Sequence, residues 1–135
     1  MKKKMMLLAG LLLSLAIPAV AIEVRITPTA LVKEGVTAAY TASGLATTNN
    51  YKVRNDGKVF LHFKKTGVGT CTVTIVTPGT VQGIAIADVT VSVPATTGDV
   101  FVGPLSPSLF NDASSDIEYT LSDTVSLSVG VFRLN

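Results

Sequence analysis

The chain has 135 residues, of which 47% are apolar and only 15% are charged, a size that allows one compact domain and little else. Its formal net charge is +2, but three of the eleven basic residues fall within the first four positions, which leaves eight bases against nine acids in the rest of the chain. The overall balance therefore argues against a nucleic-acid partner, and we expect none.

The N-terminus has the organisation of a secretory signal peptide. A basic stretch at 2–4 precedes an apolar run at 5–17, which is followed by Pro18 and by an A-x-A motif that ends at Ala21. A membrane-spanning helix is the alternative, but it needs about 20 apolar residues. A lipoprotein signal would need a cysteine at the cleavage point. We therefore predict a signal-peptide helix at 1–21, one β-domain at 22–135 and no stable membrane anchor after cleavage.

Beyond this segment, apolar and polar residues alternate with period two, and Thr, Val and Ile dominate. This alternation is typical of half-buried strands. The predicted strands are, in chain order, Glu23–Thr27, Val36–Thr41, Tyr51–Arg54, Lys58–Lys64, Thr70–Val76, Ile84–Val93, Asp99–Val102, Asp116–Leu121 and Thr124–Leu134. Eight or nine short strands separated by turns predict an all-β fold, a single antiparallel β-sandwich or jelly roll of about eight strands.

The turn Asn55-Asp56-Gly57 suits a tight hairpin, so we expect the strands on either side of it to pair. In the second of these strands, His62 lies on the face opposite Leu61 and Phe63. It is the only histidine of the chain. A metal ligand or a general base would need further ligands or partners around it, and we therefore predict no catalytic role for His62.

Cys71 is the only cysteine and alternates in phase with Val73 and Ile75. This position predicts a buried free thiol. An odd cysteine in an exported protein can also form a disulfide between subunits, which is the alternative. A nucleophilic role is disfavoured because the sequence shows no base near it.

Two other segments resemble ligand sites only superficially. The Gly67-Val68-Gly69 stretch lacks the third glycine and the strand-to-helix setting of a dinucleotide-binding motif. The segment 111–118 is rich in oxygen donors but departs from the spacing of a calcium loop, so an Asx-rich turn is preferred over a weak calcium site. We expect no metal, no cofactor and no enzymatic activity.

Charge is distributed unevenly along the mature chain. Five bases and one acid lie at 52–65, whereas six acids and no base lie at 88–123. One interpretation is that these charges protect solvated strand edges from wrong pairing. The other is that two patches of opposite sign dock identical subunits in register. The second interpretation predicts an assembly surface made of Lys52, Arg54, Lys58, Lys64, Lys65, Asp112, Asp116 and Glu118.

Several segments together resemble a group of small β-proteins encoded among the head genes of tailed bacteriophages and prophages. The resemblance covers most of the mature chain, and it rests on strands and turns rather than on reactive residues. The segments that carry it are Asn55–Gly57, Thr72–Val81, Ala87–Ala95, Gly103–Asn111 and Val125–Leu134. The resemblance implies a structural role in the virion, as a capsid-decorating or minor head protein. An export signal departs from that pattern, because such proteins assemble in the cytoplasm.

Two classes of function follow from these observations. The first is a non-enzymatic assembly subunit, forming a homo-oligomer or binding a capsid lattice, and located in the virion if the chain is phage-encoded. An exported surface fibre at the periplasm, cell surface or extracellular space is the other form of this first class. The second class is a secreted binding module, whose loops bind a glycan or a protein.

Overall fold

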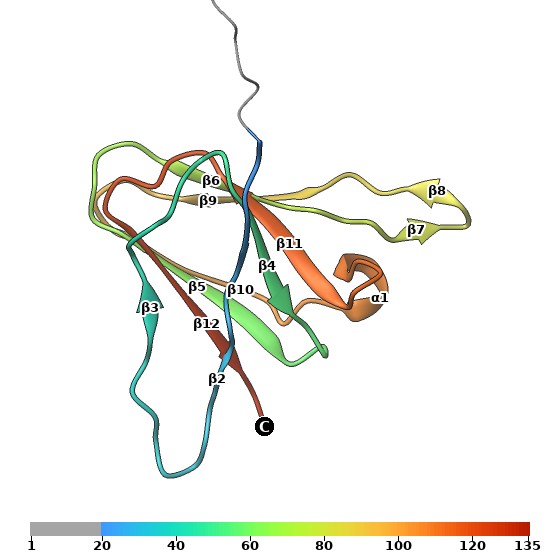
Figure 1. The fold of residues 1–135 in the computed structure, drawn as a ribbon, viewed down its shortest axis with the longest axis horizontal. Helices are drawn as coiled ribbons and strands as arrows, with labels where there is room; N and C mark the ends of the chain where they lie inside the picture. The colour runs from blue at the N-terminus through green and yellow to red at the C-terminus, as the bar shows by residue number, and fades with distance from the viewer. Residues whose placement is uncertain (1–19) are drawn as a thin grey trace, which may run out of the picture.

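The computed structural model describes residues 20–135 and shows twelve short strands and one helical turn (Figure 1). The predicted all-β class is confirmed. Positions 1–19 of the signal-peptide helix predicted at 1–21 lie outside the described residues. Within residues 20–135, no helix combines the length and the apolar character needed to cross a membrane.

The strands form two five-stranded sheets and one small hairpin. The first sheet contains, in spatial order, β1 (Glu23–Arg25), β4 (Asn50–Arg54), β11 (Asp116–Leu121), β6 (Cys71–Ile75) and β9 (Val89–Val93). The second contains β10 (Gly98–Val102), β5 (Val59–Lys65), β12 (Leu127–Arg133) and β2 (Thr29–Ala30), with β3 (Tyr40–Thr41) also paired to β12. The hairpin joins β7 (Thr80–Val81) to β8 (Ile84–Ala85), and α1 spans Pro107–Phe110.

Pairing is not antiparallel throughout, which corrects the predicted antiparallel sheet. The two N-terminal strands pair in parallel, β1 with β4 and β2 with β12. The pairs between the longer strands, such as β5 with β12 and β6 with β9, are antiparallel. The extra strands β2 and β7 have only two residues each, too few for an alternating pattern to reveal them.

A single buried cluster draws side chains from both five-stranded sheets. Val59, Leu61 and Phe63 of β5 are fully buried, as alternation predicts. The Phe63 ring packs edge-on against Tyr119 of β11, with ring centroids 5.8 Å apart. Burying an apolar side chain of this size stabilises the fold by about 1.5–3 kcal/mol, so this contact between the sheets is a major contributor to folding.

The turn at Asn55–Gly57 is tight, with Gly57 at φ +88°, but the predicted hairpin is wrong. The flanking strands β4 and β5 belong to different sheets, so the turn is a corner. The Asn55 side chain is buried and donates to Leu105 O (3.0 Å) and Asn111 Oδ1 (2.7 Å). These distant partners hold the chain as it passes from one sheet to the other.

Candidate assembly surface

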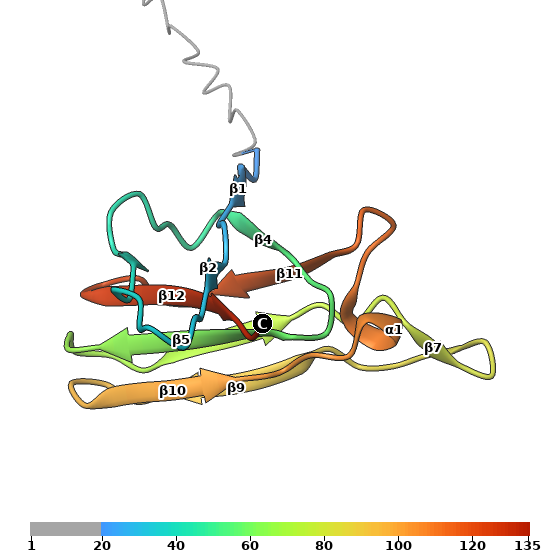
Figure 2. The same cartoon turned by 90° about the horizontal axis from the view of Figure 1, so that it is seen from below.

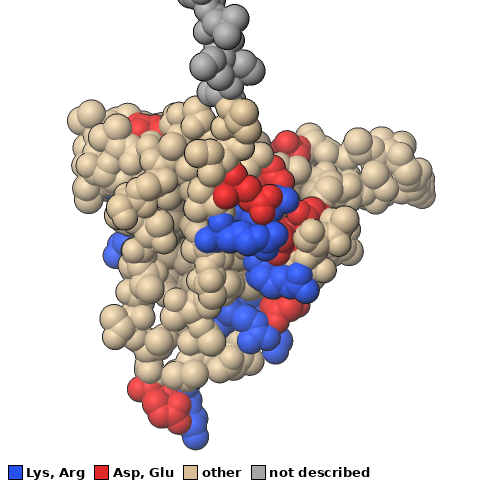
Figure 3. All heavy atoms as spheres, in the orientation of Figure 1, with Lys and Arg blue, Asp and Glu red and all other residues tan. Residues whose placement is uncertain are grey.

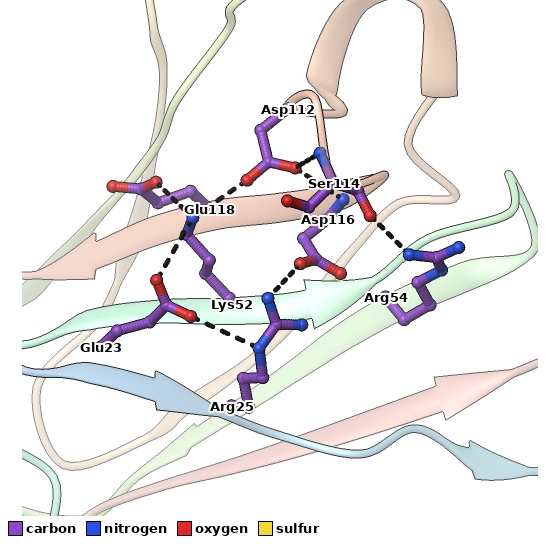
Figure 4. A network of polar contacts seen from close by, with 8 residues as sticks. All are labelled: Glu23, Arg25, Lys52, Arg54, Asp112, Ser114, Asp116 and Glu118. Carbon is purple, nitrogen blue, oxygen red and sulfur yellow. Dashed lines mark hydrogen bonds and ion pairs between the residues drawn. The ribbon is translucent and has the colours of Figure 1, made fainter.

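Lys52 lies among carboxylates on the first sheet (Figure 4). Its Nζ is 3.0 Å from Asp112 Oδ2, 3.4 Å from Glu23 Oε2 and 3.6 Å from Glu118 Oε2. Strand register produces part of this arrangement, because Lys52 on β4 stands directly opposite Glu118 on β11. Opposite charges in such cross-strand positions stabilise a sheet. The hydrogen bond to Asp112 raises the pKa of Lys52.

Next to this group, Asp116 and Arg25 form an ion pair of 2.6 Å between a fully buried carboxylate and an arginine side chain that is 55% exposed. Neither Asp116 oxygen has a hydrogen bond of regular geometry. The short distance nevertheless identifies Arg25 as the partner that neutralises the buried charge. Arg54 lies beside this pair and donates to the carbonyl of Ser114.

The oxygen-rich segment 111–118 folds as the predicted Asx-rich turn. Asp112 Oδ1 accepts from the backbone N–H of Ser114 at 2.8 Å and from that of Asp116 at 3.0 Å. The bond from the Asp116 N–H, together with Lys52, holds the pKa of Asp112 below its usual value. The cation bound by this turn is therefore the ammonium group of Lys52. Among residues 20–135, no group of three or more potential ligand side chains could hold a metal ion.

The remaining lysines of the predicted surface fall into two groups. The Lys65 side chain is fully buried; it donates to Val125 O at 2.7 Å and forms an ion pair with Asp123 at 3.2 Å. Lys58 and Lys64 are exposed, and neither forms an ion pair within the described chain. Alternation along β5 could have indicated the burial of Lys65, because that residue is in phase with the core side chains.

The basic and acidic segments thus meet within one chain. Six of the eight predicted surface residues contact other residues of their own chain, namely Lys52, Arg54, Lys65, Asp112, Asp116 and Glu118. In the space-filling view, blue and red side chains lie intermixed over one part of the visible face, and most of that face carries neither sign (Figure 3). Docking of subunits through these charges stays a prediction. Lys58 and Lys64 form no ion pair within residues 20–135, and the Lys64 Nζ lies 5.5 Å from the centroid of the Tyr40 ring.

His62 is buried rather than open on its mixed face. Its Nε2 lies 2.5 Å from Asp99 Oδ1, and its Nδ1 lies 2.7 Å from the Tyr40 hydroxyl. Because a carboxylate only accepts, the Nε2–H of His62 donates to Asp99, and the second hydrogen bond joins Nδ1 to the Tyr40 hydroxyl. The Phe101 ring stacks on the imidazole at 3.7 Å between centroids. Sequence reasoning did not find Asp99 or Tyr40, since strand register alone brings them to His62.

Cys71 is fully buried and free, and this confirms its predicted place in the core. Its neighbours in the alternating pattern, Val73 and Ile75, are fully buried as well. A thiol in this position is shielded from a second subunit, which disfavours the alternative of an intermolecular disulfide.

The segment between β6 and β9 projects from the body as an arm, which we define as residues 77–88 (Figures 1 and 2). Val81 and Ile84 near its tip are 57% and 71% exposed. The turn between them, Gln82-Gly83, has positive φ at both residues, as in a type I′ turn. Asp88 at its base is the only charged residue of the arm.

The base of the arm is anchored at two points. The Thr77 N–H donates to Asp88 Oδ1 at 2.8 Å, and the Gly79 N–H donates to Leu109 O at 2.9 Å. A Cβ on Gly79 would lie 2.8 Å from Leu109 Cα, so only glycine allows this close approach to α1. The predicted single strand Ile84–Val93 is therefore two strands, interrupted where Asp88 turns back to the backbone of Thr77.

Residues 20–135 enclose no pocket. Comparison with known protein families, with curated proteins and with solved structures finds no match for this chain.

Proposed function

We propose that the chain is a non-enzymatic assembly subunit that binds copies of itself or a capsid-like lattice, and that its two five-stranded sheets form a β-sandwich. The observation that carries this proposal is the uncharged tip of the arm, which holds Val81 and Ile84 in solvent. A two-stranded hairpin on its own is at best marginally stable in water. Covering the arm with a partner removes apolar surface from water, at about 25 cal/mol per Å².

The resemblance to phage head proteins supports a place in the virion, as a decoration or minor head protein. It runs through the arm itself, because its segments include Thr72–Val81 and Ala87–Ala95. The signal-like N-terminus supports the other location, in which the same assembly chemistry builds an exported surface fibre.

A secreted binding module is the second candidate, and one observation favours it. Phe101 is 63% exposed and stacks on His62, with Tyr40 and Asp99 bonded to the same imidazole. An exposed aromatic ring beside polar groups is a common element of recognition surfaces. This surface would bind a glycan or protein ligand without any need for self-association.

Sedimentation velocity over a concentration series, combined with co-sedimentation with phage heads, tests the proposal. We expect the wild-type chain to associate, and the double variant Val81→Lys, Ile84→Lys to lose association while keeping its circular dichroism spectrum. The matched control is Val32→Lys, Val36→Lys, which changes two exposed valines in the loop between β2 and β3, a loop that lies away from the arm in Figure 1. A wild-type chain that stays monomeric at high concentration and does not bind heads would favour the binding module instead.

A further inference from the structure

The edges of the two large sheets differ in how well they are protected against pairing. Natural sheets protect edges with charged residues, prolines or very short strands. β1 carries Glu23 and Arg25, β10 carries Asp99, and β2 and β3 have two residues each. Among the edge strands of residues 20–135, only β9 has five residues and neither a charge nor a proline.

The sequence of β9, VTVSV, is also complementary to itself. In an antiparallel pair of two copies centred on Val91, Val89 faces Val93 and Thr90 faces Ser92. Apolar side chains then meet on one side of the joined sheet and hydroxyls on the other, and both kinds of cross-strand pair are favourable. Asp88 falls opposite Pro94 of the second copy, so this register opposes no like charges.

We propose that β9 pairs with β9 of a second copy around a two-fold axis at Val91, joining the first sheets of two chains into one continuous sheet. This inference rests on the proposed assembly function and specifies its partner and its surface. The contact is isologous, because each chain contributes the same strand. In Figure 2, β9 lies at the rim of the molecule with the arm extending from the same level, so a partner at that rim meets both.

The same register gives the arm a contact surface on the second copy. Counting outward from Val91, Ile86 of one chain falls opposite Thr96 of the other. The Thr96 N–H donates to Gly67 O at 2.9 Å, which places this turn next to Val68. Val68 is 77% exposed. The exposed apolar tip of each arm is thus directed to the exposed apolar turn at the far end of its partner, opposite the arm in Figure 1.

Disulfide trapping tests the register directly. In a Cys71→Ala background, one chain carries Thr90→Cys and another carries Ser92→Cys. Directly opposite residues of an antiparallel pair have Cα atoms about 4.5–5.5 Å apart, within the range of a disulfide. We expect mild oxidation of the mixed chains to give a crosslinked dimer, and oxidation of either chain alone to give little. A mixture that does not crosslink, or single chains that crosslink equally well, would overturn the proposed register.

A charge placed on the edge tests the surface without cysteines. Thr90→Lys should weaken self-association at least tenfold in sedimentation equilibrium, whereas Thr72→Lys on neighbouring β6, also exposed, should leave it unchanged. Association that survives Thr90→Lys but is lost in Val81→Lys, Ile84→Lys would refute β9 pairing and leave the assembly function standing. Wild-type chains that never associate and never bind heads would refute both.

Discussion

The two edges of the first sheet differ in the chemistry that they present to solvent. On the β1 side, Lys52, Arg25 and Arg54 neutralise or bond to groups on neighbouring strands of the same chain. On the β9 side, the strand and the arm that precedes it present Val, Ile and Thr side chains and a free backbone edge. The first edge carries charged groups that are paired within the chain, whereas the β9 strand at the second edge carries no charge.

This contrast changes how the uneven distribution of charge along the sequence is interpreted. The basic segment and the acidic segment were candidates for contact between subunits, but β4 and β11 are adjacent strands and bring them together within one chain. Exposed ion pairs contribute only about 0–1 kcal/mol each. Apolar burial and strand pairing at the β9 edge therefore provide a stronger basis for association.

Charge reversal at the paired lysines should have the largest effect on folding. Lys52→Glu together with Lys65→Glu should prevent folding, because each new carboxylate would lie beside existing ones and Lys65 is fully buried. The matched double variant Lys58→Glu, Lys64→Glu changes two exposed lysines and should fold normally. Circular dichroism with thermal melting measures both. Equal melting temperatures would show that the ion pairs of Lys52 and Lys65 contribute nothing to the stability of the fold.

Acid should have the next largest effect, because it removes the stabilisation that the ion-paired carboxylates provide. The pKa of Asp112 is lowered by the Asp116 N–H and by Lys52, and that of Asp123 by the Val125 N–H and by Lys65. A carboxyl whose folded-state pKa is depressed stabilises the protein above its unfolded pKa of about 3.9, and this stability is lost as pH falls through the folded pKa.

Urea unfolding at a series of pH values should therefore show stability falling below about pH 4, where these carboxylates begin to bind protons in the unfolded chain. Asp112→Asn should flatten part of that fall. A wild-type profile that is flat between pH 5 and pH 2 would contradict the role given to these carboxylates.

Two stacked tyrosines in the core should give smaller effects on stability, of opposite sign. Tyr51 and Tyr119 have ring centroids 5.2 Å apart, but only the Tyr51 hydroxyl has partners, Ala46 N and Ala46 O. The Tyr119 hydroxyl is buried without one. Since an unsatisfied buried hydroxyl costs about 1–3 kcal/mol, Tyr119→Phe should stabilise the fold, whereas Tyr51→Phe should destabilise it by about 1 kcal/mol.

The same pair predicts a difference at alkaline pH. Burial raises the pKa of Tyr119, so the folded state keeps its proton while the unfolded chain loses it above about pH 10, and stability falls as pH rises. Tyr119→Phe should remove this component of the alkaline loss. Chemical denaturation at pH 7 and at pH 11 measures both effects, and a Tyr119→Phe variant less stable than wild type at both values would contradict them.

Cys71 should give the smallest effect. Because the thiol is fully buried, a thiol reagent should react slowly with native protein, and Cys71→Ala should cost about 1 kcal/mol through a small cavity. Association should be unaffected. Fast labelling under native conditions, or a dimer that dissociates under reducing agents, would show that this side of the sheet is more accessible than the structure indicates.

The sequence predicted strands well wherever alternation was long, as at Val59 to Phe63 and around Cys71. It misjudged the Asn55–Gly57 turn because the partners that make it a corner, Leu105 and Asn111, lie about fifty residues away. Local turn chemistry is the same in a hairpin and in a corner. The sheet to which each flanking strand belongs distinguishes the two, and the long-range hydrogen bonds of the Asn55 side chain hold the corner in place.

The candidate surface was less predictable than the strands. Composition located the charges correctly, but the sheet order that pairs Lys52 with Glu118 depends on which strands become neighbours. Only residues 84–88 of the arm fell inside a predicted strand, and the glycine at position 83, directly before that strand, is a turn signal that could have revealed the hairpin.

The contact of Gly79 with α1 has a mechanical consequence. At the base of the arm, Gly79 fits so closely against Leu109 that the backbone has little room to move. A segment held in its binding direction before a partner arrives loses less conformational freedom when it binds. The helical turn at Pro107–Phe110 therefore helps to set the direction of the arm, and we expect Gly79→Ala to change that direction although Gly79 lies outside the apolar tip.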